Sequence, residues 1–136
     1  MISNFHWPEP ENDFDERLIS NVKTYGCHVM NIFADESGPG WAFSIGLYVN
    51  FGHPEVIIFG LKERTAHLII NDICGRVARG ERFEAGDRSN LLLEGLDVSF
   101  VDFALPHYRD HLGYGNWFYS SLPDLYPVLQ LVWPDR

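Results

Sequence analysis

Residues 38–60 constrain the fold more than any other part of the chain, because they predict two strands joined by a short turn. In the first of these strands large and small side chains alternate, which indicates two faces with different surroundings. The small face is nearly bare around Ser44 and Gly46, and the turn after it carries His53 and Glu55. Such a face admits either a helix of the same chain or a flat ligand. Its large face would be formed by Trp41, Phe43, Ile45, Leu47 and Val49.

The remaining pattern predicts an α+β fold with a mainly antiparallel, curved sheet of about six strands and three helices, because the strands are grouped and do not alternate with helices. The apolar stripe from Ala66 to Val77 needs a sheet to cover it, so this helix is the natural lid for the bare strand face. Residues 1–14 read as an acidic lead and residues 15–136 as one domain. Helices are predicted over residues 13–25, 63–79 and 106–119, and the other strands over residues 27–34, 91–94, 98–103 and 127–133, the last of them central in the sheet.

The charge of the chain restricts its partners. The net charge is −9, and residues 1–36 contain seven acidic residues against two basic ones. Phosphate backbones and anionic membranes repel such a surface, so we expect neither nucleic acid nor membrane as a partner. A basic protein is the complementary partner, with Asp35 and Glu36 as candidate contacts. No apolar run is long enough to cross a bilayer and the first residues do not resemble a signal peptide, so we expect a cytoplasmic protein.

The two cysteines do not form a known metal or redox motif. Cys27 and Cys74 are far apart in the sequence and neither belongs to a Cys-x-x-Cys motif. We therefore expect two reduced, buried thiols by default, and a disulfide between them stays open as the alternative.

The sequence contains fragments of catalytic motifs but no complete set. The His53-Pro54-Glu55 segment has the His-x-Glu of zinc deaminases but lacks their Pro-Cys-x-x-Cys. His107 and His111 have a spacing that zinc can use, yet there is no glutamate base and no third ligand. Phosphate-binding loops and a nucleophile elbow are absent from the sequence. We therefore predict no metal and no cofactor, and the chain reads as a non-enzyme more readily than as an enzyme.

Several motifs together resemble the bacterial domain of unknown function 4262 family. The resemblance extends from Asp15 to Asp135, and its motifs agree in order and spacing. It implies little about activity, because the family has none assigned. A weaker resemblance, to flavin-reductase split barrels, rests only on the rhythm of small residues in the strand. The motifs that carry the first resemblance are GPGWAFSIGL at 38–47, GHPEVIIFGL at 52–61, TAH at 65–67, GERF at 80–83 and PVLQLVWPD at 127–135.

Two functions of different classes follow from these observations. The first is a non-enzymatic protein-binding module, most concretely an immunity protein that neutralises a cognate bacterial toxin. Its candidate partner contacts are the two acids, Asp35 and Glu36, and the aromatic residues Trp41, Trp117 and Tyr119, since aromatic side chains dominate binding hot spots. The alternative is a small flavin- or ligand-binding enzyme of split-barrel type. In that enzyme Ser44 and Gly46 would contact the ligand, and His53 and Glu55 would act as acid and base.

Overall fold

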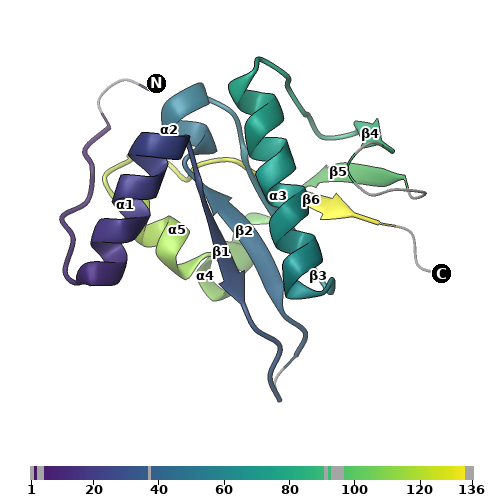
Figure 1. Cartoon of the computed structure of the whole chain (residues 1–136), viewed down its shortest axis with the longest axis horizontal. Helices are drawn as coiled ribbons and strands as arrows, with labels where there is room; N and C mark the ends of the chain where they lie inside the picture. Colours follow the sequence, from purple (N-terminus) through teal and green to yellow (C-terminus); the bar gives the residue numbers. More distant parts are fainter. Residues whose placement is uncertain (1, 3–4, 37, 91, 93–96, 134–136) are drawn as a thin grey trace.

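The computed structural model describes residues 2, 5–36, 38–90, 92 and 97–133, and in this part of the chain six strands form one sheet (Figure 1). The strand order is β1-β2-β3-β6-β5-β4; β3 and β6 are parallel, and the other neighbours are antiparallel. The predicted α+β class is confirmed, and the apolar last strand lies inside the sheet as expected. The strands are β1 (His28–Ile32), β2 (Trp41–Ile45), β3 (Glu55–Phe59), β4 (Arg88–Ser89), β5 (Val98–Asp102) and β6 (Val128–Val132).

The two long helices form where the sequence predicts them. Helix α1 (Asp13–Tyr25) begins after Asn12, whose side chain accepts the N–H of Asp15 at 2.9 Å, and it ends at Gly26, which has a left-handed φ of 94°. Helix α3 (Glu63–Ala78) buries its predicted stripe against the sheet. Both helices are therefore fixed by local signals and by the burial of one face.

The strand predicted to run to Val49 ends at Ile45. Gly46, with a φ of 125°, turns the chain into the short helix α2 (Leu47–Phe51). A Cβ at Gly46 would lie 2.6 Å from the carbonyl oxygen of Gly26, so only glycine allows this close approach. The expectation that Leu47 continues the face of Trp41 is wrong, because Leu47 packs in the core beneath α3 on the opposite side of the sheet.

The third predicted helix is divided into three short elements. A 3-10 turn, η1 (Leu105–His107), is followed by α4 (Tyr108–His111) and α5 (Gly113–Phe118). Leu112 breaks the run because its φ of −122° and ψ of 31° are not helical. The strand predicted at residues 91–94 lies outside the described residues except for Leu92; the described neighbours of β5 are β4 and β6.

The sheet separates two apolar cores. One lies beneath α3 and includes Ala42, whereas the other lies against α1, α4 and α5 and includes Phe43. Residues of the acidic lead also belong to the second core, since the rings of Phe5 and Trp7 lie 5.4 and 5.5 Å from that of Phe118. None of the helices in the described part of the chain is both long and apolar enough to span a bilayer.

A disulfide joins Cys27 to Cys74, so the default expectation of two reduced thiols is wrong. The bond connects the residue before β1 to the middle of α3, across a sequence separation of 47 residues. The spacing of two isolated cysteines carries no signal of their distance in the fold, and only the packing of α3 over β1 brings them together.

Candidate functional site

Glu55, the first residue of β3, is completely buried and is the centre of a polar network. Its two oxygens accept five hydrogen bonds, and every partner is a donor. Because a protonated carboxyl would need an acceptor for its own hydrogen, this arrangement fits the ionised carboxylate. The donors are Ser44 Oγ at 2.7 Å, the N–H of Gly46 at 2.9 Å, the N–H groups of Leu47 and Tyr48 at 3.2 Å each, and the Tyr119 hydroxyl.

The electrostatics of the network explain why Tyr119 belongs to it. Burial raises the pKa of Glu55, and the hydrogen bonds from Tyr119, Ser44 and the backbone oppose that rise. Burial and the nearby carboxylate also raise the pKa of Tyr119 well above its ordinary value. The phenol therefore stays protonated and donates a hydrogen bond to the carboxylate. The carboxylate also accepts the N–H groups at the start of α2.

The bare strand face predicted around Ser44 and Gly46 is filled by the protein itself. Ser44 is 1% exposed, and its Oγ donates to Glu55 and accepts the N–H of Val56 at 3.0 Å. Gly46 is buried against the backbone of Gly26 and Cys27, and the stripe of α3 covers the same face at Ala42. The predicted lid helix is confirmed at Ala42, and the Gly26–Cys27 backbone covers the rest. There is no open surface for a flat ring at Ser44 or Gly46.

His53 is also used internally. Its Nε2 accepts the N–H of Phe83 at 3.0 Å, so Nδ1 carries the proton and donates to the carbonyl of Pro54 at 2.7 Å. Burial lowers the pKa of this imidazole, in agreement with the neutral form. Through these two bonds His53 connects the segment after α3 to the start of β3. Among the described residues no hydrogen bond joins His53 to Glu55. His53 and Glu55 thus have separate hydrogen-bond partners, and both side chains are buried.

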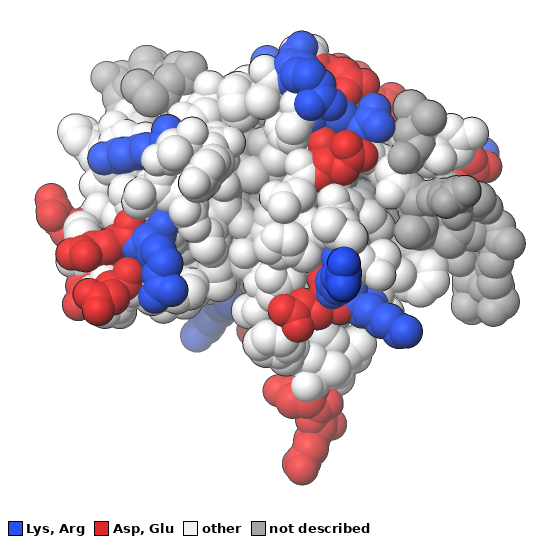
Figure 2. All heavy atoms as spheres, in the orientation of Figure 1, with Lys and Arg blue, Asp and Glu red and all other residues white. Residues whose placement is uncertain are grey.

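The five predicted partner contacts occupy different environments. Asp35 and Glu36 are exposed in the loop between β1 and β2, which forms the lowest projection of the molecule and ends in acidic atoms (Figure 2). Trp41, half-buried, lies at the base of that loop. Trp117 is half-buried on α5 with its ring 6.0 Å from that of Tyr114, whereas Tyr119 is 3% exposed and lies inside the molecule. Only the first three residues belong to one surface.

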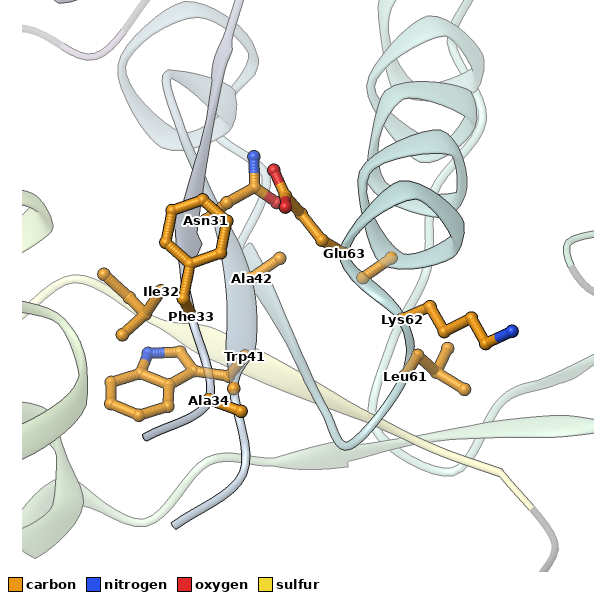
Figure 3. Close-up of a pocket in the computed structure, with 11 residues that line it drawn as sticks. Asn31, Ile32, Phe33, Ala34, Trp41, Ala42, Leu61, Lys62 and Glu63 are labelled. Atoms are coloured by element: carbon orange, nitrogen blue, oxygen red, sulfur yellow. The ribbon is translucent and has the colours of Figure 1, made fainter. Parts of the chain in front are cut away.

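Two hollows flank this β1–β2 loop. The first, of about 260 Å³, lies between the loop and the start of α3, and the side chains of Asn31 and Glu63 reach into it while Lys62 points away (Figure 3). Asn31 contacts His67 Nδ1 at 3.2 Å through its amide nitrogen, and its Oδ1 is buried with no partner among the described residues. Nothing in the sequence around Asn31 signals an unpaired amide, so this residue is not predictable from local pattern.

The second hollow, of about 250 Å³, lies on the other side of the loop. Its wall combines aromatic residues of β2, β3 and α4 with residues of the loop. We call it the aromatic hollow. It is lined by Ile32, Asp35, Gly38, Pro39, Trp41, Phe59 and His111.

The two histidines of the predicted zinc spacing are His107, at the end of η1, and His111, at the end of α4, and their rings lie 6.1 Å apart. His111 Nδ1 donates to the carbonyl of His107 at 3.0 Å, so this nitrogen is occupied within the helix. Within the described ranges no group of three or more His, Cys, Asp or Glu side chains is placed to hold a metal ion.

The comparison with known proteins adds a family to this geometry. The family model for a domain of unknown function (DUF4262) matches residues 21–136, which include the Glu55 network, the β1–β2 loop and both hollows. The chain belongs to this family. The resemblance noted from the motifs is thus confirmed, and the DUF4262 match begins within α1. No curated protein and no solved structure matches the chain.

Proposed function

We propose that this DUF4262 chain is a non-enzymatic protein-binding module that docks a basic partner at the β1–β2 loop. One observation carries the proposal: His53 and Glu55 are consumed by internal hydrogen bonds, whereas the loop carries exposed acids between two hollows. The first hollow also holds the unpaired acceptor Asn31 Oδ1. Because that oxygen is buried, the feature that a basic partner complements is the pair of exposed acids.

The most concrete partner of this kind is a toxin with a basic cleft. An enzyme that cleaves nucleic acid carries Lys and Arg residues where it binds phosphates, and an acidic projection of another protein can occupy that cleft. The net charge of −9 supports such an encounter. As an immunity protein the chain would act in the cytoplasm, where reductants disfavour disulfides. Reductants there would open the Cys27–Cys74 bond, so an immunity function in that compartment requires the fold to tolerate its loss.

Co-expression with the product of the neighbouring gene tests the proposal. If that product stops growth, the chain should restore growth by binding it. The double variant Asp35→Lys, Glu36→Lys should lose protection and should associate more slowly at low salt, because rim charges govern association rates. The exposed Asp124→Lys serves as the control and should protect fully. Equal protection by the double variant, or a neighbouring product that the chain does not bind, would count against this function.

The flavin-binding alternative has less support. It needs open surface at Ser44 and Gly46, which the chain fills, and a barrel, whereas the described sheet is open with β1 at one edge and β4 at the other. Its test is simple: purified protein should be colourless and should not quench flavin fluorescence. Stoichiometric quenching of flavin fluorescence would instead make the flavin-binding enzyme the leading candidate.

A further inference from the structure

The aromatic hollow has a rigid wall of three mutually contacting rings. The ring of Trp41 lies 5.9 Å from Phe59 and 5.0 Å from His111, and Phe59 lies 5.3 Å from His111. All three residues are half-buried, so part of each remains accessible to solvent. Because they come from β2, β3 and α4, the wall is held by three separate elements of the fold.

Hydrogen bonds fix this wall and the loop that faces it. Trp41 Nε1 donates to the carbonyl of His111 at 2.9 Å, and His111 Nδ1 donates to the carbonyl of His107. Across the hollow, Asp35 and Gly38 exchange backbone hydrogen bonds of 3.0 and 3.2 Å that close the loop. A site built in this way loses little conformational freedom when it binds a ligand.

The charges of the hollow favour a cation. Asp35 contributes to the lining and Glu36 follows it, while none of the described lining residues is Lys or Arg. Aromatic faces attract cations through the ring quadrupole, most strongly at tryptophan. Nδ1 of His111 is the donor to His107, so the acceptor nitrogen of this tautomer is Nε2. The hollow therefore offers a carboxylate, a stacking surface and an acceptor nitrogen.

We propose that the aromatic hollow binds the guanidinium group of an arginine presented by a partner protein. Guanidinium is planar, weakly hydrated and stacks on aromatic rings while it donates in its own plane, so it uses all three features, whereas a lysine ammonium uses fewer. The inference rests on the proposed function in taking the partner to be a basic protein, and it adds which side chain is recognised and where.

A titration with capped tripeptides tests the site without any partner. The probes are acetyl-Gly-Arg-Gly-amide and the same peptide with citrulline, which has nearly the shape of arginine but no charge. The readout is the Trp41 indole N–H in proton–nitrogen NMR spectra, assigned with Trp41→Phe. We expect the arginine peptide to shift this signal and the citrulline peptide to bind about tenfold more weakly. Lysine in place of arginine should fall between them.

Matched variants keep the test falsifiable even if substitution of Trp41 disturbs the fold. Asp35→Asn should weaken arginine binding about threefold, as expected for a partly exposed charge pair, and Asp124→Asn should leave it unchanged. Equal binding of arginine and citrulline, or shifts confined to residues that line only the hollow in Figure 3, such as Asn31 and Glu63, would overturn the inference. Failure of the peptide to reach Trp41 in a chain that still protects cells would reject this site alone. Arginine binding in a chain that protects no cell would reject the immunity function alone.

Discussion

Replacement of Tyr119 by phenylalanine should destabilise the protein more than the same change at another buried tyrosine, Tyr108. The Tyr119 hydroxyl donates to Oε2 of Glu55 and accepts the N–H of Val49 at 3.2 Å. The substitution keeps the ring, so it removes one oxygen and leaves the packing of the aromatic core in place. Its effect therefore reports on the polar network.

The magnitude follows from the two bonds that are lost. A hydrogen bond to a charged group contributes about 1.5–3 kcal/mol, and a buried N–H left without a partner costs about 1–3 kcal/mol. Val49 is fully buried, so water does not replace the missing oxygen. We expect Tyr119→Phe to lower the free energy of unfolding by about 3–5 kcal/mol, a large part of the 5–15 kcal/mol typical of a domain.

Tyr108→Phe is the matched control. Tyr108 is 4% exposed, and its hydroxyl donates to the neutral carbonyl of Tyr126 at 2.8 Å. The substitution leaves that one buried acceptor without its partner and should cost about 1–3 kcal/mol. Urea unfolding followed by tryptophan fluorescence measures both variants. In Tyr119→Phe the pKa of Glu55 should also rise, which an infrared titration of the protonated carboxyl detects. Equal losses in the two variants, with no change at Glu55, would refute the role assigned to Tyr119.

Three further predictions concern other parts of the fold. Gly46→Ala should lower the free energy of unfolding by about 2–5 kcal/mol, because the added Cβ would overlap the Gly26 backbone at a residue with positive φ. Gly52→Ala, which also has a positive φ but open space around it, should lower it by only about 1–2 kcal/mol in the same urea unfolding experiment. Burial lowers the pKa of His53, so the imidazole binds a proton more tightly in the unfolded chain, and the free energy of unfolding should fall as the pH drops below about 6.5. His53→Gln should reduce the slope of that fall. An unchanged slope would contradict the role of His53. Reduction of the Cys27–Cys74 bond should cost about 4 kcal/mol, and a melt indifferent to reductant would contradict its contribution.

The sequence predicts those parts of the fold whose causes are local. Asn12 and Gly26 mark the ends of α1 because capping acts within one helical turn, and the isoleucine stripe of α3 predicts burial against a sheet. The sheet class followed from the order of these elements. The sequence also shows that the His53-Pro54-Glu55 segment lacks the other residues of a known catalytic motif.

The elements that the sequence misplaces are fixed by distant residues. Alternation continues to Val49, so periodicity favours a longer strand; what ends it is the Glu55 carboxylate, which takes the N–H groups of residues 46–48. Tyr119 reads as one more surface or core aromatic, and nothing near it in the sequence points to Glu55. The Cys27–Cys74 disulfide is likewise a contact between residues that are far apart in the sequence. Pairing of positions far apart in the chain carries no local signal.

The contact between Glu55 and Tyr119 has a consequence for synthesis of the chain. The two residues are 64 positions apart, which a ribosome covers in roughly 3–13 s. During that interval the carboxylate has no phenol to meet, and β3 lacks its parallel neighbour β6, so its backbone groups form an open edge. In a nascent chain that stops before residue 119, β1, β2 and β3 can pair, but β3 has no neighbour on the side that β6 occupies in the folded protein. The native sheet therefore forms only after β6 has been synthesised, and a chaperone that shields β3 until then would protect this edge.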